Sequence, residues 1–378
     1  MKLAVLSETR PGERRVALVP DMVAKLVSAG VEVTLQQGAG LGSYFDDSAF
    51  HESGARLAPD AKSAADGADA VLKVQAPTPA EVETLPGGTT LIGLFQPSSQ
   101  IEVVKKLAES RVDMFSLDLL PRISRAQGMD ALSSQATVQG YKAALMAADM
   151  LPRFFPMFMT AAGTVPPAKV LVLGAGVAGL QAIATARRLG AVVRAYDVRA
   201  ASRQEVESLG ASFVEIALET KEGAGGYASA QSEEFLAAQR ELIGAQVAAS
   251  DVVITTAAIP GRAAPLLVTS EMVDAMPAGS VIIDIAAESG GNCELSQPGS
   301  DVVHHNVTIR GTANLASSMP THASALYARN ISNFFLAMLK DGEFKPDFDD
   351  EIISATCVLR SGEVVHPPTR ERIHQDVT

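Results

Sequence analysis

One glycine-rich segment constrains the fold more than any other stretch of this 378-residue chain. It runs from Lys169 to Asp197 and reads KVLVLGAGVAGLQAIATARRLGAVVRAYD. An apolar strand run, a GxGxxG turn, a helical run and a second strand ending in an acid follow in the order of a dinucleotide-binding βαβ unit. A glycine motif alone also fits a tight structural turn, but here all the elements stand at suitable distances. We therefore predict a dinucleotide site.

Each element of the segment has a physical task in such a site. The glycines tighten the turn and let the backbone approach a pyrophosphate, while the first helical turn offers unpaired N–H groups and a positive dipole end. Asp197 accepts hydrogen bonds from ribose hydroxyls and repels a 2′-phosphate, which favours NAD(H). Arg194 and Arg199 could accept a 2′-phosphate, which leaves NADP(H) as the alternative. We favour NAD(H), because Asp197 occupies the position at the end of the strand.

The amino-acid composition limits the classes of protein to which this chain can belong. The length suits two domains, and 47% hydrophobic with 20% charged residues is typical of globular domains. The net charge of -12 and the lack of a basic stripe argue against a nucleic-acid partner. Two cysteines favour a reducing compartment. The N-terminus lacks the pattern of a signal peptide, and the most apolar stretches, such as 154–165, are too short to span a membrane.

Strand-like and helical runs alternate along most of the chain. In the first third we expect helices from about Pro20 to Ala29, Ala61 to Asp66 and Ile101 to Glu109, between apolar strands. A long helix is expected from about Ser134 to Phe155, capped by Ser133 or Ser134, and another from about His322 to Lys340. The tail EIISATCVLRSGEVVHP reads as two β-like runs around Ser361 and Gly362.

This alternation predicts an α/β protein with two Rossmann-like, doubly wound parallel-sheet domains and a cleft between them. The first domain is expected to be discontinuous, built from residues 1–132 and 312–378, and to lack a glycine fingerprint. The second, residues 133–311, is expected to bind the dinucleotide and to carry a mobile loop at about 219–232. That loop lies in a long connection from Glu219 to about Ser250, and it is either a lid anchored by Tyr227 or a surface loop without function.

A polar loop follows the strand run VDMFSLDLL. Arg122, Arg125, Gln127 and Asp130 stand together there, and they suit either a ligand with phosphate and carboxamide groups or a solvated loop with one salt bridge.

Other polar groups indicate less. Arg14, Arg15 and Lys73 near strand ends are either an anion site or ordinary surface charges. His304 and His305 are adjacent, which places them poorly for one ion, and we predict no metal site.

The motifs resemble those of a known family. Five segments carry the resemblance: RPGERRVALVP at Arg10 to Pro20, PRISRAQGMDALSSQ at Pro121 to Gln135, the segment Thr160 to Ala191, GGYA at Gly225 to Ala228 and GGNCELSQPG at Gly290 to Gly299. They are similar to the NAD(H)-binding component of proton-translocating NAD(P) transhydrogenase, which is domain I and forms the first portion of the alpha subunit. The likeness covers nearly the whole chain. Alanine dehydrogenases share this architecture and resemble the chain at Arg15, Lys73 and the fingerprint.

Two positions separate these relatives. Alanine dehydrogenases are expected to carry a histidine after the strand LIGLF and an aspartate before the later GG pair, where this chain has Gln96 and Glu288. Oxidising an amine requires a group that manages a proton, whereas passing hydride between two nicotinamide rings does not. The transhydrogenase resemblance is therefore the better fit.

The resemblance implies particular site residues. The loop residues expected to hold the nicotinamide end and to face the partner are Arg122, Gln127, Asp130 and Ser133, which are the candidate catalytic residues. The full cofactor-binding set that it implies is Arg122, Ile123, Ser124, Gln127, Gly128, Met129, Asp130, Gly174, Ala175, Gly176, Val177, Gly179, Asp197, Val198, Arg199, Gly226, Tyr227, Gln239 and Ala258.

The resemblance also implies an activity and a setting. It implies an oxidoreductase subunit that transfers hydride directly between NADH and NADP+, with NADP(H) held by a partner subunit and the reaction coupled to proton translocation. The chain is expected to be a homodimer without a membrane span of its own, in the cytoplasm and peripheral on the inner face of the bacterial cytoplasmic membrane through membrane and NADP(H)-binding subunits. The alternatives are an amino-acid dehydrogenase of the alanine dehydrogenase kind and an NAD(H)-sensing binding module.

Overall fold

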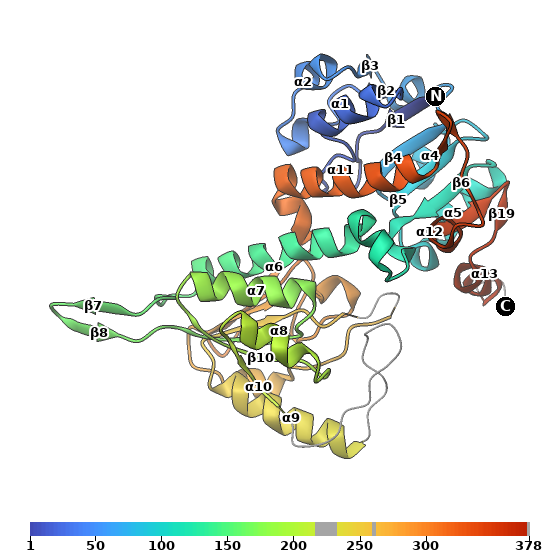
Figure 1. Cartoon of the computed structure of the whole chain (residues 1–378). Helices are drawn as coiled ribbons and strands as arrows, with labels where there is room; N and C mark the ends of the chain where they lie inside the picture. Colours follow the sequence, from blue (N-terminus) through green and yellow to red (C-terminus); the bar gives the residue numbers. More distant parts are fainter. Residues whose placement is uncertain (216–232, 259–261, 376–378) are drawn as a thin grey trace. The chain divides into compact units, whose positions relative to one another are not determined.

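The fold is taken from a computed structural model that describes residues 1–215, 233–258 and 262–375. The chain divides into two compact units, one formed by Met1–Gln135 with Ala316–Thr378 and the other by Ala136–Leu315 (Figure 1). Each unit is an α/β layer structure with its own sheet and its own hydrophobic clusters. The predicted α/β class, with two Rossmann-like domains and a discontinuous first domain, is confirmed.

The first unit contains an eight-stranded sheet in the order β19-β18-β6-β5-β4-β1-β2-β3. The six strands from β3 to β6 are parallel and follow the order 3-2-1-4-5-6 of a Rossmann fold, while β18 and β19 add an antiparallel edge. The strands are β1 (Lys2–Val5), β2 (Glu32–Gln36), β3 (Arg56–Ala58), β4 (Ala70–Gln75), β5 (Thr90–Leu94), β6 (Asp113–Ser116), β18 (Cys357–Arg360) and β19 (Glu363–Val364).

Helices cover both faces of this sheet, which is why its central strands read as unbroken apolar runs. Phe334 and Phe335 of α11 pack on one face, and Val104 and Leu107 of α5 pack on the other. The helices are α1 (Pro20–Ser28), α2 (Asp47–Glu52), α3 (Ala61–Ala65), α4 (Pro79–Val82), α5 (Ile101–Glu109), α11 (Pro320–Ala337), α12 (Glu351–Thr356) and α13 (Pro367–Gln375), with a small hairpin of β16 (Leu339–Lys340) and β17 (Glu343–Phe344).

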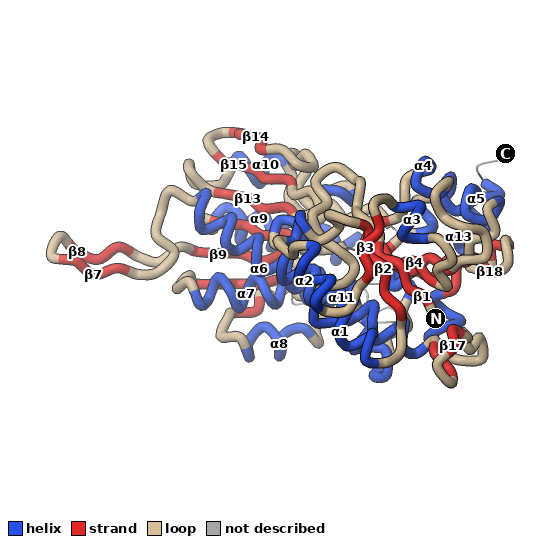
Figure 2. The backbone as a smooth tube through the Cα atoms, turned by 90° about the horizontal axis from the view of Figure 1, so that it is seen from above, coloured by secondary structure: helices blue, strands red, loops and turns tan. Residues whose placement is uncertain are grey.

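The second unit repeats the same strand order in a seven-stranded sheet, β11-β10-β9-β12-β13-β15-β14, with β14 as the antiparallel edge (Figure 2). Buried apolar residues form one cluster on each face of the sheet. Its strands are β9 (Lys169–Leu173), β10 (Val192–Tyr196), β11 (Ser212–Phe213), β12 (Val252–Thr255), β13 (Val281–Asp284), β14 (Asp301–His304) and β15 (Val307–Gly311), and its helices are α7 (Val177–Arg188), α8 (Ser202–Ser208), α9 (Glu233–Ala248) and α10 (Ser270–Asp274), with α6 (Ala131–Met150) leading into it.

Helix α6 differs from its prediction at both ends. It begins at Ala131, because Asp130 accepts a hydrogen bond from the Ser133 N–H at 2.9 Å as an N-cap does, so neither Ser133 nor Ser134 is the cap. It ends at Met150, two residues before Pro152, since proline disfavours helical backbone at the residue that precedes it.

Two further segments depart from expectation. The β-like runs predicted around Ser361 and Gly362 are strands β18 and β19, but the residues before them, EIISAT, form helix α12, at whose start Asp350 accepts from the Ile352 N–H. Helix α9 occupies the second half of the connection after Glu219, for which an irregular course is predicted. The apolar stretch after α6 forms a hairpin of β7 (Phe158–Thr160) and β8 (Gly163–Val165), whose residues are all exposed and which projects from the second unit (Figure 1).

Candidate functional site

The glycine turn lies at the carboxyl end of β9, between the ends of β10 and β12. This is the point where the strand order reverses, and ligands of open α/β sheets bind there. The three glycines have different surroundings. A Cβ atom on Gly174, whose φ is 100°, would lie 2.7 Å from Thr256 Oγ1, and one on Gly179 would lie 1.9 Å from the Gly174 carbonyl oxygen. A Cβ atom on Gly176 would meet nothing within 4 Å.

Each glycine therefore performs a separate task. Gly174 makes the turn, and Gly179 lets helix α7 pack directly on the turn. Gly176 keeps open the space above the backbone, at the N-cap of α7, where none of the described side chains forms a cap hydrogen bond. An uncapped N-terminus beside open space suits an anionic group, so the residues present fit the pyrophosphate of a dinucleotide.

Asp197 follows β10 and connects the second strand to the turn. Its Oδ2 accepts from the Ala175 N–H at 2.7 Å and from Arg199 Nη2 at 2.9 Å, and its Oδ1 accepts from the Arg199 N–H at 2.8 Å. Burial raises the pKa of this carboxyl, but the hydrogen bonds from Arg199 and the Ala175 N–H outweigh it and hold the pKa below its usual value. The acid is thus a carboxylate at neutral pH, and Arg199 is engaged with it.

A polar network that the sequence analysis missed supports the turn from the neighbouring strands. Thr256 Oγ1 donates to the Gly174 carbonyl at 3.0 Å. Asn292 accepts from the Ala257 N–H at 3.0 Å and donates to the Ala257 carbonyl at 2.8 Å, and Asn292 is itself held by buried Asp284 at 2.9 Å. Its signals in the sequence were the aspartate that ends the apolar run SVIID and Asn292 within the segment GGNCELSQPG.

The remaining predicted residues of the second unit differ in their exposure to solvent. Val198 is half-buried beside Asp197, and Val177 is 42% exposed at the start of α7. Gln239 of α9 donates to the Tyr196 hydroxyl at 2.9 Å, and burial raises the pKa of that tyrosine to about 12. Ala258 is exposed just after β12. The predicted lid residues Gly226 and Tyr227 lie outside the described residues.

The predicted polar loop belongs to the first unit and is a 3-10 segment, η4 (Ser124–Met129). Its apolar side chains face inward, with Ala126 buried and Ile123 and Met129 packed against the core. The loop is tied to α11, because Asn330 and Asn333 both donate to the Gly128 carbonyl, at 3.1 and 3.0 Å. In this anchored loop three polar residues of the predicted set are exposed, namely Arg122, Ser124 and Gln127.

Three other polar residues of the loop have structural partners. Asp130 accepts from both the backbone and the hydroxyl of Ser133, the latter at 2.5 Å, at the start of α6. Arg125 forms an ion pair with Asp350 at the start of α12. Asp130 and Ser133 therefore take part in capping helix α6, in addition to their predicted role in catalysis. Arg125 joins the η4 segment to the start of α12.

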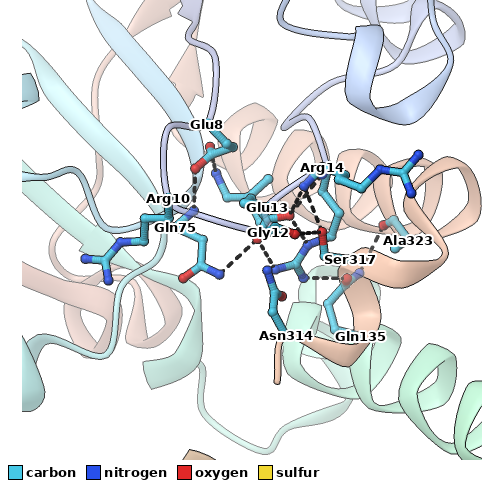
Figure 3. A network of polar contacts seen from close by, with 12 residues as sticks. Glu8, Arg10, Gly12, Glu13, Arg14, Gln75, Gln135, Asn314, Ser317 and Ala323 are labelled. Carbon is cyan, nitrogen blue, oxygen red and sulfur yellow. Dashed lines mark hydrogen bonds and ion pairs between the residues drawn. The ribbon is translucent and has the colours of Figure 1, made fainter. Parts of the chain in front are cut away.

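Arg15 and Lys73 are buried, which rules out the reading as ordinary surface charges. Arg15 pairs with Glu13 at 2.6 Å and donates to Gln135 at 2.8 Å, in the network shown in Figure 3. Burial raises the pKa of Glu13, but the hydrogen bonds and the charge of Arg15 outweigh this effect and lower the pKa to about 2. Lys73 donates to Glu81 at 2.7 Å, with Glu8 at 3.6 Å.

The structure thus assembles two groups of predicted residues. The turn residues, Asp197, Val198 and Arg199 meet at the carboxyl ends of β9 and β10 in the second unit. Residues 122–130 form one anchored loop on the first unit, and Ser133 follows it in the first turn of α6. Among the residues that the structure describes, no helix combines the length and apolarity needed to cross a bilayer.

Known proteins share both units. Residues 4–139 match the family described as alanine dehydrogenase/PNT, N-terminal domain, and residues 143–367 match its C-terminal domain. The first part of subunit alpha of NAD(P) transhydrogenase from Rhodospirillum rubrum is 49% identical, with 97% of this chain and 98% of that protein covered.

Two further relatives show that the chain is more similar to a transhydrogenase than to an alanine dehydrogenase. A solved structure of transhydrogenase from Sinorhizobium meliloti is 42% identical with a TM-score of 0.86, covering 97% of this chain and 99% of that one. Alanine dehydrogenase of Halomonas elongata is more distant, at 29% identity with 98% and 96% covered. The chain therefore belongs to the alanine dehydrogenase/PNT family, and within it to the alpha subunits of NAD(P) transhydrogenase.

Proposed function

We propose that this chain binds NAD(H) on its second unit and passes hydride directly to NADP+ that a partner subunit holds. The observation that carries the proposal is the turn at Gly176, which is open above the backbone at an uncapped helix N-terminus and lies beside the carboxylate of Asp197. The open turn suits the pyrophosphate, and the carboxylate suits the adenosine ribose of NAD(H) while repelling a 2′-phosphate. Arg199 supports the same choice, because its guanidinium is engaged with Asp197.

The pair of positions that distinguishes the relatives supports hydride exchange. Gln96 follows β5 and is exposed, and Glu288 lies in the short 3-10 segment η6 (Ala287–Ser289) after β13, where its carboxylate accepts from the Asn314 N–H at 2.8 Å. Neither position carries the histidine or aspartate expected of an alanine dehydrogenase. Bound NADH supplies the hydride from C4 of its dihydronicotinamide ring, and this transfer requires no acid or base from the protein.

The protein's contribution is then orientation and proximity. We assign the nicotinamide end to the anchored loop, with Arg122, Gln127, Asp130 and Ser133 as its candidate catalytic residues. The loop is suited to this task because its apolar side chains and the Gly128 carbonyl are held by the first unit while Arg122 and Gln127 face outward. Correct placement of two reacting rings contributes up to roughly 7–11 kcal/mol to such reactions.

The proposal includes partners and a location. The Rhodospirillum rubrum relative is named as one piece of a divided alpha subunit, which supports the view that other subunits supply the NADP(H) site, the membrane segments and the coupling to proton translocation. The chain would then lie in the cytoplasm, peripheral on the inner face of the membrane.

The β7–β8 hairpin supports a homodimer. Met157, Phe158 and Met159 are 42–78% exposed, and residues 154–168 carry no charge. An isolated two-stranded hairpin is marginally stable in water, and exposed apolar patches mark contacts.

The experiment is a transfer assay with the full chain, NADH and an NADP+ analogue, with and without membranes that contain the partner subunits. The expected result is NADH oxidation with stoichiometric reduction of the analogue, only when both protein fractions are present. Binding of NADH without transfer in the complete system would instead indicate an NAD(H)-sensing module. Formation of NADH from alanine and NAD+ by the isolated chain would indicate an amino-acid dehydrogenase and overturn the proposal.

A further inference from the structure

A cluster of two histidines and an aspartate lies on the second unit, at the end of the sheet opposite to the glycine turn. His304 ends β14 and pairs in register with Val307, the first residue of β15, and β15 runs parallel to β9 through β13 and β12. His304 therefore lies at the amino end of the parallel strands, whereas the glycine turn lies at their carboxyl end. Asp274 ends α10, which precedes β13.

A tight turn brings the two adjacent histidines to the same side. In a regular strand, neighbouring side chains point to opposite faces. Here His305 and Asn306 have φ values of 45° and 60° and form the two-residue loop of the β14–β15 hairpin, as in a type I′ turn. The Asn306 carbonyl accepts from the Gly279 N–H at 2.8 Å, which ties the turn to the segment that follows α10. The position of the histidines relative to α10 is therefore fixed by the backbone.

The three side chains converge on one point. His304 Nε2 lies 2.7 Å and His305 Nδ1 lies 2.8 Å from the same oxygen, Asp274 Oδ1. The two imidazole rings stack with centroids 4.5 Å apart. Within the described residues this is a group whose three ligand atoms all lie within 4.8 Å of one another. A zinc ion with bonds of about 2.0–2.2 Å holds its ligands at separations of about 3–4 Å, so small side-chain rotations suffice.

We propose that Asp274, His304 and His305 bind one divalent transition-metal ion, with zinc as the representative. Two imidazole nitrogens and a carboxylate oxygen favour Zn²⁺, Ni²⁺ or Cu²⁺ over Mg²⁺ and Ca²⁺, which prefer oxygen ligands. The side chains are 42%, 33% and 65% exposed, respectively, so water completes the coordination. The site departs from the expectations that adjacent histidines are placed poorly for one ion and that the chain has no metal site, because the turn and Asp274 become neighbours only in the folded unit.

Binding at this place has a structural consequence. The ion would join the end of α10 to the β14–β15 hairpin, which the backbone already connects through Asn306 and Gly279. An ion that binds the folded state and not the unfolded chain raises the thermal midpoint with its concentration. The bridge lies at the far end of the sheet from the glycine turn, so NADH binding serves as an independent measure of folding.

The test uses the full chain without a histidine tag, freed of metal by chelator and dialysis. Zn²⁺ is titrated by calorimetry, with Mg²⁺ as the hard-cation control, against the parent, His304→Gln and Asp274→Asn. His51→Gln is the matched control, because His51 is an exposed histidine of the first unit. The expected result is one Zn²⁺ per chain in the parent and in His51→Gln, affinity at least about tenfold weaker in the two cluster variants, and no Mg²⁺ binding.

A crystal of the parent soaked in Zn²⁺ makes the test independent of whether the variants fold. An anomalous peak between the three side chains supports the site. Absence of Zn²⁺ binding, equal binding in the cluster variants, or a peak elsewhere would overturn it.

Discussion

At the residue scale, the glycine turn separates two roles that the sequence motif presents together. Gly176 faces open space, whereas a side chain on Gly179 would collide with the Gly174 carbonyl. One glycine is therefore required by the proposed ligand and the other by the fold.

This difference predicts opposite phenotypes for two single-methyl substitutions. Gly176→Ala should leave the free energy of unfolding nearly unchanged and weaken NADH binding by about tenfold, because the methyl group fills the space proposed for the pyrophosphate. Gly179→Ala should lower the free energy of unfolding by about 1–3 kcal/mol through overpacking. Urea unfolding and fluorescence titration with NADH measure the two effects, and each variant is the control for the other. Unchanged NADH affinity in Gly176→Ala would argue against a pyrophosphate at this turn.

Gln127 permits a test of the proposed placement of the nicotinamide ring. Gln127→Ala should slow hydride transfer in the complete system by about 100-fold, since small displacements of reacting groups are costly, while the Kd for NADH changes little. Stopped-flow transfer and NADH binding are compared with Gln37→Ala, which removes an exposed glutamine elsewhere in the first unit. Equal losses of transfer and binding would mean that Gln127 contributes general affinity and does not position the ring.

At the element scale, the β7–β8 hairpin combines an apolar sequence with exposure to solvent. Phe158–Thr160 and Gly163–Val165 are exposed along their whole length, and the hairpin shows no charge that would keep it in water. Its proposed role is the contact between two copies of the chain.

A charge on strand β7 of the hairpin tests this role. Met159, which is 78% exposed, should be covered in the dimer, so Met159→Glu should raise the dimer dissociation constant by at least about 100-fold, or ~3 kcal/mol, because a carboxylate would be buried. Sedimentation equilibrium measures the constant. Val303→Glu, at an equally apolar position that is 69% exposed on β14, is the control. If Met159→Glu dimerises like the parent, the hairpin is not the contact.

At the scale of the whole molecule, buried ion pairs couple stability to pH. Glu13 is fully buried beside Arg15, and the pKa of its carboxyl is lowered to about 2 from an ordinary 4.5. A carboxyl whose pKa is lower in the folded state stabilises the fold above the unfolded pKa and loses that contribution as pH falls through the folded pKa. The shift corresponds to about 3 kcal/mol.

Glu13→Gln should therefore have a pH-dependent effect. At pH 7 the substitution leaves Arg15 without its carboxylate and should destabilise the protein by about 3–5 kcal/mol. The difference from the parent should shrink as pH falls from 4.5 towards 2, where the parent also loses the charge. Urea unfolding across this range measures it, with Glu52→Gln as the exposed control. A difference that stays constant with pH would exclude the ion pair as its source.

Much of the fold could be predicted because local patterns decide it. The apolar runs of buried strands and helices such as Ile101–Glu109 follow from the periodicity of hydrophobic residues within short segments. The glycine turn follows from the backbone geometry that glycine allows. A prediction was wrong where local pattern and tertiary context conflict, as in α12, where EIISAT has β-branched residues but is capped by Asp350.

The candidate site divides in the same way. The turn, its acid and the polar loop could be predicted before folding is considered, because each is a contiguous motif whose chemistry does not depend on distant residues. Three features became visible only in the folded protein: Arg15 and Lys73 are buried and paired, Asn292 and Asp284 support the turn, and Asp274 lies against His304 and His305. These groups are far apart in sequence, and hydrogen bonds and ion pairs act only over the few ångströms that folding establishes.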